Sequence, residues 1–256
     1  MIGALMKQKI VTTLAATMFV CSGLASADEM VAVKVGYMLL TPSGQFASTV
    51  NNVGTRVNME TDLGLKNSQQ PIGEITVNLG DSAITAGFVP MTFSGSSVLN
   101  RNITYAGTTY TAGSTVSSEF KADIFDIGYT YYVVNMDDLP SRFQLGIETA
   151  VKVVTAKTSM TGAGVTSSNN ATVPIPTVGL RARVALADFI GLTGRIGYLG
   201  YSGNSILDAD AQIEFSPLPT LGIYVGYRQL KLKVDSNSVY VNSTFSGPYA
   251  GAFFRF

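Results

Sequence analysis

Histidine is absent from the 256 residues, and this absence excludes a large group of mechanisms. Ser-His and Cys-His nucleophiles, histidine general bases and histidine-ligated zinc all require an imidazole. Tryptophan is also absent, Cys21 is the only cysteine, and charged residues make up only 13% of the chain. The 17 basic and 17 acidic residues cancel, which argues against nucleic-acid binding through a basic surface. We therefore expect a protein that is not an enzyme and has no nucleic-acid partner.

Long apolar runs are missing as well, so no segment reaches the roughly 20 residues of a transmembrane helix. The N-terminus has the order of a secretory signal peptide: two lysines, the largely apolar run Ile10–Val20, and the small residues Ala25-Ser26-Ala27. That run is too short for a transmembrane anchor. We expect residues 1–27 to be cleaved, which leaves 28–256 as one exported domain without cysteine.

Alternation of polar and apolar residues predicts strands with two different faces. In Leu207–Phe215 the odd positions are apolar, whereas the even positions are Asp, Asp, Gln and Glu. Such segments follow one another along the chain and predict an all-β fold. Their even number predicts an antiparallel up-and-down transmembrane β-barrel of about ten strands, and a count between eight and twelve stays open. The expected strands are 31–40, 71–80, 82–96, 115–136, 142–157, 172–187, 189–202, 204–215, 219–234 and 239–256.

Short connections alternate with longer polar ones along these strands. Bacterial outer-membrane barrels have short periplasmic turns and longer outer loops, so we expect both termini in the periplasm. The strand-like Met59–Leu65 is assigned to the first outer loop, since a further spanning strand would make the count odd. In the second outer loop, Ala106-Gly107 predicts a hairpin turn. The short turns are 79–82, 136–141, 186–189 and 216–219, and the long outer loops are 41–70, 94–114 and 157–171.

Two expected strands break the alternation. In 115–136 the polar positions change parity between Asp123 and Asp126, and in 219–234 the apolar positions change parity between Tyr227 and Leu230. A β-bulge would shift the phase. A strand that rises out of the membrane would also relax the pattern, and both explanations stay open.

The chain ends on Phe256, with Phe254 and further apolar residues at steps of two before it. This end resembles the C-terminal strand of bacterial outer-membrane barrels, where a terminal Phe is read by the insertion machinery. The chain is similar to small outer-membrane barrel proteins grouped with the transmembrane domain of outer membrane protein A, and Thr61–Leu65 and Phe245–Tyr249 look like that group. The resemblance implies the bacterial outer membrane, with Phe254 and Phe256 as an assembly signal and the barrel assembly machinery as a partner.

A secreted soluble β-sandwich that binds a partner is the main alternative fold, because it also shows alternating strands. The terminal Phe, the loop asymmetry and the charges on the polar faces favour the barrel. Aromatic residues near the strand ends suit the interfacial girdles of such barrels. These are Tyr129, Tyr131, Phe189, Tyr198, Phe215, Tyr227 and Phe254.

The polar faces of the strands predict a lumen lined by seven basic and six acidic residues. A nearly balanced set of charges can pair and fill a narrow barrel, whereas a functional alternative is a weakly selective pore. Asp208, Asp210 and Glu214 lie on a strand and lack the loop of an EF-hand, so we expect no metal and no cofactor. The lumen charges are Lys34, Glu74, Asp126, Glu148, Lys152, Arg181, Arg183, Arg195, Asp208, Asp210, Glu214, Arg228 and Arg255.

These features together favour a structural or surface-presenting role for a monomeric integral outer-membrane barrel. Its expected surroundings are outer-membrane lipid and lipopolysaccharide. A narrow, porin-like channel for small solutes is the leading alternative function. The enzymes known among small outer-membrane barrels rely on histidine, and this chain has none.

Overall fold

The structure is a computed structural model that describes residues 30–48, 54–136, 142–218, 220–235 and 239–256. The predicted signal peptide and most of the predicted turn at 136–141 lie outside these residues. In the described ranges, no helix has the length and apolar character to cross a membrane.

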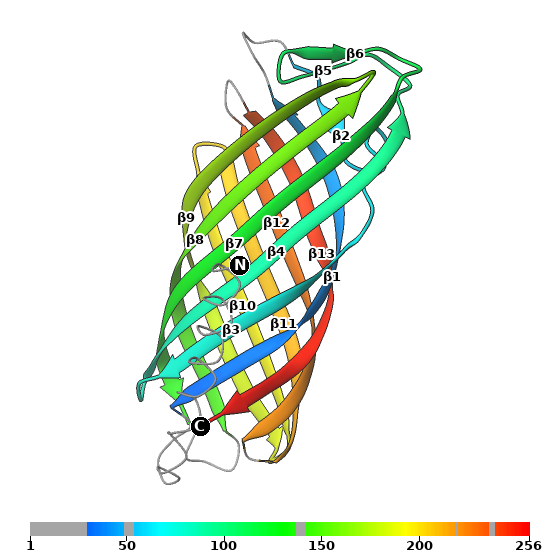
Figure 1. Cartoon of the computed structure of the whole chain (residues 1–256). Coiled ribbons are helices and arrows are strands. Elements are labelled where there is room, and N and C mark those ends of the chain that lie inside the picture. The colour runs from blue at the N-terminus through cyan, green and yellow to red at the C-terminus, as the bar shows by residue number, and fades with distance from the viewer. Residues whose placement is uncertain (1–29, 49–53, 137–141, 219, 236–238) are drawn as a thin grey trace, which may run out of the picture.

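Ten long strands follow one another around a closed barrel, and each pairs antiparallel with the next (Figure 1). The ring closes because β13 pairs with β1, from Ala32↔Arg255 to Ser48↔Val239. The predicted ten-stranded antiparallel barrel is confirmed, and the β-sandwich alternative is wrong. The ten strands are β1 (Val31–Ser48), β3 (Ser68–Asn78), β4 (Ser82–Val98), β7 (Thr115–Asn135), β8 (Phe143–Gly162), β9 (Val165–Ala187), β10 (Ile190–Tyr201), β11 (Asn204–Leu218), β12 (Leu221–Asp235) and β13 (Val239–Arg255).

Three short strands lie in the outer loops. β2 (Val57–Asn58) pairs with β1 inside the first loop, and residues 59–63 form turns, so the predicted loop position of Met59–Leu65 is confirmed. β5 (Ile103–Tyr105) and β6 (Thr108–Tyr110) form the predicted hairpin around Ala106-Gly107.

The strands extend further outward than the sequence pattern predicts. The expected loop at 157–171 is wrong, because β8 and β9 continue to Gly162 and Val165 and are joined by the two residues between them. β1 likewise continues to Ser48 instead of ending at residue 40. The outer end of the barrel therefore differs from the inner end mainly by its long strands and only partly by its long loops.

The outer surface of the barrel carries an apolar band. Outward residues such as Ile147, Val225 and Ile213 are about half exposed, as is expected for side chains that face lipid. All seven aromatic residues predicted near the strand ends point outward and are exposed. Above the band, the outward residues of the strands that continue are mostly polar, although Val98 at the end of β4 is apolar and 63% exposed. On these strands the apolar band ends at Leu39, Pro71, Pro90, Phe125, Val153, Pro174, Tyr227 and Pro248.

The two phase breaks in the sequence mark this boundary. β7 keeps one register with β8 from Val116↔Gly162 to Tyr132↔Gly146, and β12 keeps one register with β13 along its whole length. No bulge therefore lies at either break. On β7 the outward face changes from Phe125 to Asp123 while the side chains keep alternating. Both strands rise out of the membrane, as the second explanation requires.

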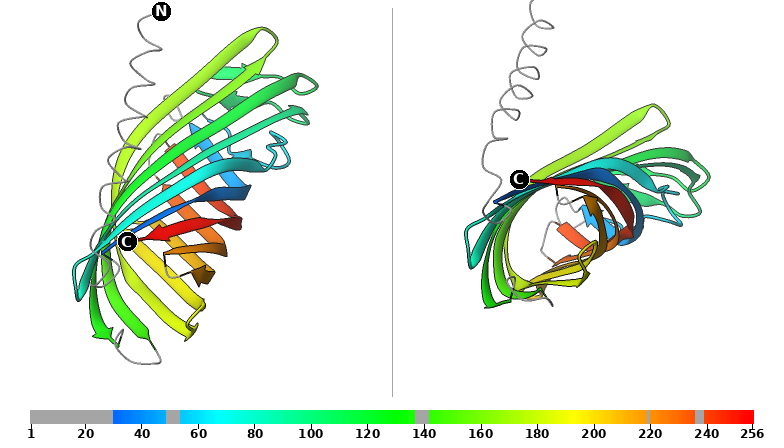
Figure 2. Two further views of the ribbon diagram at one scale, coloured as in Figure 1. Left: turned by 60° about the horizontal axis from the view of Figure 1, so that its bottom comes forward. Right: turned by 90° about the horizontal axis from the view of Figure 1, so that it is seen from below.

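We call the strand segments above the apolar band the outer extension. It comprises 41–48, 92–98, 115–123, 155–162, 165–172, 229–235 and 239–246. The β8–β9 hairpin is its longest projection (Figure 2), whereas the β10–β11 hairpin ends lower, at Ser202-Gly203 (Figure 1). The wall of the outer extension is therefore uneven around the barrel.

Candidate functional site

The lower half of the barrel interior holds the thirteen predicted lumen charges. Twelve of them take part in ion pairs with one another, and Asp210 accepts a hydrogen bond from the Tyr249 hydroxyl at 2.6 Å. The structure thus brings together side chains that the sequence distributes over nine of the ten strands.

Asp208 is the centre of the most buried group of charges. Its side chain is 1% exposed, and both of its oxygens accept hydrogen bonds from Arg228, at 2.9 and 2.8 Å. The Lys152 ammonium lies 2.7 Å from Asp208 and 3.0 Å from Asp126, so one lysine bridges two carboxylates. Arg195 approaches the same Asp126 at 3.6 Å. Buried charges are costly unless they are paired, and this group meets that requirement.

Glu214 is the centre of a second group near the inner end of the barrel. Its carboxylate lies 2.9 Å from the Lys34 ammonium, 3.8 Å from Arg183, and in contact with Arg255. Gln212 also donates to Glu214 at 2.7 Å. One carboxylate therefore joins strands β1, β9 and β13 to β11 by electrostatic contacts across the lumen.

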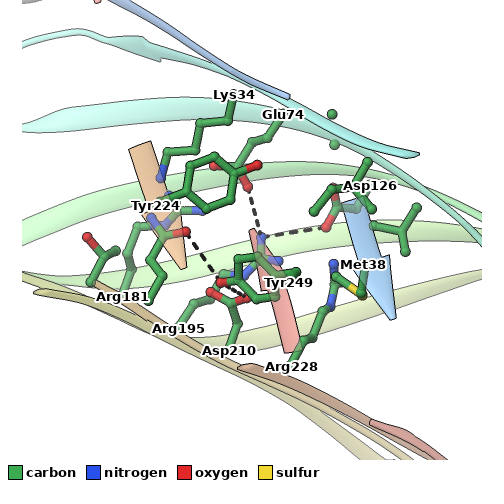
Figure 3. A pocket seen from close by; sticks show the side chains of 16 residues that line it. Lys34, Met38, Glu74, Asp126, Arg181, Arg195, Asp210, Tyr224, Arg228 and Tyr249 are labelled. Atoms are coloured by element: carbon green, nitrogen blue, oxygen red, sulfur yellow. Dashed lines mark hydrogen bonds and ion pairs between the residues drawn. The ribbon is translucent and has the colours of Figure 1, made fainter. Parts of the chain in front are cut away.

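Two small cavities remain among these charges. The central one has a volume of about 50 Å³ and the inner one about 60 Å³, enough for a few water molecules each. Figure 3 shows the central cavity, with Arg195 between Glu74 and Asp126 and with Tyr249 on Asp210. Both cavities share the residues Lys34, Glu74, Arg181 and Thr193.

Two tyrosines that sequence reasoning missed occupy the wall of the central cavity. The rings of Tyr224 and Tyr249 meet edge to face at 5.8 Å. A Cβ added at Gly36 would lie 2.6 Å from the Tyr224 hydroxyl, so the absence of a side chain on β1 makes room for this ring. Inward glycines opposite inward tyrosines were the available signal in the sequence.

The upper half of the interior is mainly apolar, so the predicted lumen charges occupy only the lower half. Each of the ten strands changes from polar to apolar inward residues at one level, where the band outside ends. We call the inward apolar side chains at and above this level the apolar plug. Its lowest layer is Met38, Ile72, Val89, Ile124, Val154, Ile175, Leu199, Ile206, Leu230 and Phe245.

Aromatic rings fill the centre of the apolar plug. Phe245 stacks on Phe93 and on Phe120, with ring centroids 5.4 and 5.5 Å apart. Phe46 packs against Phe120 from β1. Phe93 is fully buried and Phe245 is 2% exposed. Rings from four strands thus close the bore above the central cavity.

The outer loops pack onto the apolar plug and cover it. We call residues 57–65 and 103–110 the outer cap. Val57, Met59 and Ile103 are completely buried, and the Tyr110 hydroxyl donates to the Met160 carbonyl at 2.9 Å. Burial also raises the pKa of the Tyr105 hydroxyl above its ordinary value, so this group stays protonated.

A polar contact joins the first and second outer loops beside the outer cap. Arg101 donates to Asp62 and to the Arg56 carbonyl, at 2.5 and 2.7 Å. The Asp62 carboxylate also accepts the backbone N–H of Asn58 at 2.9 Å. Arg56 in turn lies over the Tyr240 ring, 4.1 Å from its centre. The first outer loop is therefore fixed to the second loop and to β13.

The predicted assembly residues lie at the inner end of β13. Phe254 and Phe256 are 47% and 52% exposed on the outside of the barrel. They continue the outward apolar face of that strand, while Phe253 and Arg255 point inward. Their role in assembly stays a prediction.

Comparison with solved structures finds the same fold in a known outer-membrane protein, OmpT. The outer membrane protease OmpT from Escherichia coli matches with a TM-score of 0.60 and 12% identity, over 92% of this chain and 99% of that one. Ail of Yersinia pestis, solved in complex with a heparin analogue, matches with a TM-score of 0.40 and 12% identity, over 88% and 99%. Neisserial surface protein A gives 0.36 and 11%, over 90% and 99%. No family model and no curated protein matches the chain.

The closed antiparallel ring, the outward apolar band and the shared fold agree with one another. A closed ring satisfies every backbone hydrogen bond of its strands within the membrane, which an open sheet cannot do. The chain is a small ten-stranded β-barrel protein of the bacterial outer membrane.

Proposed function

We propose that the protein is a closed, non-conducting barrel that presents the outer extension and the outer cap on the cell surface. The apolar plug carries this proposal. Its rings and aliphatic side chains close the bore on all ten strands, and the buried loop residues of the outer cap add a second layer. A path for solutes would have to cross both layers.

The charges below the apolar plug support a structural role. Paired charges hold opposite walls of the barrel at fixed distances, as Lys152 does between Asp126 and Asp208. The central Arg228 contact is bidentate, which is the geometry of a strong and specific pair. In this proposal the lumen is a polar core that maintains the barrel shape.

The proposal includes the absence of catalysis and a monomeric state. OmpT is a protease, but the likeness of this chain to it extends to the fold alone. Without histidine, the present chain lacks the commonest general base. The apolar band would contact outer-membrane lipid and lipopolysaccharide, and the barrel assembly machinery would read the exposed Phe254 and Phe256.

A narrow channel is the second candidate. The two cavities favour it, because they are polar, adjacent and lined by several cationic side chains. Conduction would then require the apolar plug to move aside.

Conductance across a planar bilayer tests the proposal. Refolded protein is first shown to be heat-modifiable on a gel, which establishes that the barrel has formed. We expect no stable, uniform current steps. Uniform steps from inserted protein would replace the surface-presenting role by the channel.

A variant of the protein tests which side chains block the bore. The variant with Phe93→Ala and Phe245→Ala removes two of the stacked rings. Current through this variant, but not through the unmodified protein, would assign the closure to the apolar plug.

A further inference from the structure

The upper part of β9 is paired with a neighbouring strand on one side only. β9 pairs with β8 from Gly162↔Val165 down to Phe143↔Val184, whereas its pairing with β10 begins at Val178↔Tyr198. Within the described residues, the other edge of β9 is therefore without a neighbouring strand over 165–177. Figure 1 shows the β8–β9 hairpin ending above the β10–β11 hairpin, which is drawn in yellow.

The hairpin turn determines which backbone groups face this open edge. Ala163 and Gly164 both have positive φ, of 50° and 79°, as in a type I′ turn. In such a hairpin the flanking pair, Gly162 and Val165, exchanges both backbone hydrogen bonds. Alternation along an antiparallel ladder then directs odd-numbered residues of β9 toward β8 and even-numbered residues toward the open edge.

Proline protects only the lower part of the edge. Pro174 and Pro176 both fall on positions that face the edge, and neither has an N–H to offer. Further out, Thr166, Ser168 and the two even residues that follow keep both N–H and C=O. The whole segment 165–177 contains no charged residue, so it lacks the usual lysine that discourages pairing at an edge.

No strand lies beside the upper edge in the described residues, although the inner face of β9 is contacted at Ser167, whose hydroxyl donates to Thr108 of β6 at 2.7 Å. The neighbouring wall ends at the Ser202-Gly203 turn. Val173, which points toward the barrel axis, is 49% exposed, and Asn169 and Ala171 on the same face are exposed as well. An additional strand along β9 would continue the wall above β10 and cover the apolar side chain of Val173.

We propose that the segment Thr166–Thr172 of β9 binds an extended, uncharged segment of a partner polypeptide as an added β-strand. Backbone hydrogen bonds supply the affinity in this mode of recognition, and the neutral edge favours a neutral partner. Proline confines the contact to the part of β9 furthest from the membrane. The inference rests on the proposed surface role, since the partner must reach the outer extension from outside the cell.

A second copy in the same membrane does not fit this edge. Two identical edges join in a regular antiparallel ladder through a two-fold axis perpendicular to the sheet. That axis lies close to the membrane plane and would turn one copy upside down. The occupant is therefore a segment of another chain.

The test uses refolded full-length barrel and a labelled synthetic peptide. The probe has the sequence Val153–Thr161, which pairs with β9 on its other side, and carries Lys157→Gln to remove its charge. One variant combines Ser168→Pro with Asn170→Pro, which removes two edge-facing N–H groups that the β8–β9 ladder does not use. Its matched control combines Ser168→Ala with Asn170→Ala, which removes the same side chains and keeps both N–H groups.

Fluorescence anisotropy of the probe should give saturable binding to the unmodified protein and to the alanine variant. Binding to the proline variant should be at least about tenfold weaker, since two backbone hydrogen bonds are lost. Heat modifiability shows that each variant forms the barrel. In the complex, amide exchange at Thr166, Ser168, Asn170 and Thr172 should slow.

Three results would overturn the inference. The first is absence of probe binding to the unmodified protein. The second is equal weakening by the proline and alanine pairs, which would show recognition through side chains. The third is tethering of vesicles that carry the protein, lost in the proline variant, because the occupant would then be a second copy in a facing membrane. The conductance measurement tests the surface role independently of these three results. Failure of the strand addition can therefore be distinguished from failure of the surface role.

Discussion

The embedded part of the barrel and the outer extension use the same strands with opposite polarity. On β7, Phe125 and Ile127 face lipid while Asp126 is buried inside. Higher on the same strand, Asp123 faces outward while Ile124 is buried inside. The direction of each side chain follows from the strand alternation alone. The chemistry at each position follows from the medium that surrounds the barrel at that height.

The comparison also shows why both halves are stable. In the embedded part the lipid already surrounds the exterior, so polar side chains can be placed only inside, where they pair. In the outer extension water surrounds the exterior, and apolar side chains gather inside as in a soluble protein. Both the inward and the outward face of the strands therefore change polarity at the membrane boundary.

The largest effect is expected at the inner end of the lipid-facing surface. Phe256→Ser should sharply lower the amount of folded barrel in the outer membrane of cells, if the exposed terminal ring is read during assembly. Thr244→Ala, at an outward position of the same strand above the band, should assemble normally. Heat-modifiable protein in isolated outer membranes is the measurement. Equal assembly of both variants would show that the Phe256 ring is not needed for assembly.

Loss of a carboxylate should be severe inside the embedded part and mild outside the outer extension. Asp208→Ala leaves Lys152 and Arg228 buried without their shared partner. We expect a loss of about 3–5 kcal/mol in the free energy of unfolding. Asp123→Ala, on the exposed outward face of β7, should change it by less than about 0.5 kcal/mol. Denaturant unfolding of refolded protein compares the two, and equal losses would contradict the assignment of inside and outside.

Addition of a charge tests the lipid-facing surface of β11. Arginine at Ala211, between Leu207 and Phe215 on the outward face, should destabilise the barrel by about 2–4 kcal/mol if the position lies near the bilayer midplane. Arginine at Gln212 should be tolerated better, since that side chain lies inside next to Glu214. The same unfolding measurement in lipid vesicles applies. Similar tolerance at both positions would show that the outward face of β11 does not meet lipid.

The smallest effect on the free energy of unfolding is expected for a substitution within the apolar plug. Phe245→Leu keeps an apolar side chain but loses the stacking on Phe93 and Phe120, and should cost about 1 kcal/mol. Ser246→Ala, the outward neighbour, should change stability by less than about 0.5 kcal/mol. A result in which the two substitutions are equivalent would mean that the rings are not packed.

Much of the embedded part could be predicted from the sequence. In Leu207–Phe215 the lipid and the lumen impose opposite compositions on alternate residues, so the pattern is strong. The specific partners could not be predicted, because Lys152 meets Asp126 and Asp208 only after the sheet closes on itself. Contacts across a lumen depend on the register of every intervening pair of strands.

The outer extension could be predicted only in part. On β9, Ser168 and Asn170 are exposed, and the opposite face carries the buried but polar Ser167 beside the exposed Asn169 and Ala171, so no apolar face signals a strand. The polar stretch 157–171 therefore predicts a loop instead of two strands. On β7 and β12 the pattern was strong but inverted, and the sequence alone did not separate an inversion from a bulge.

Thiol accessibility along β7 tests the central claim most directly. Single cysteines are placed at Lys121, Asp123, Phe125 and Ile127 on the outward face and at Ile124 on the inward face, in a chain without residues 1–27 and therefore without other cysteines. In lipid vesicles, a water-soluble thiol reagent should label 121 and 123 and should leave 124, 125 and 127 unmodified. Labelling at 124 would show a water-filled bore, and protection of 121 and 123 would show that the membrane covers the outer extension; either result would contradict the account.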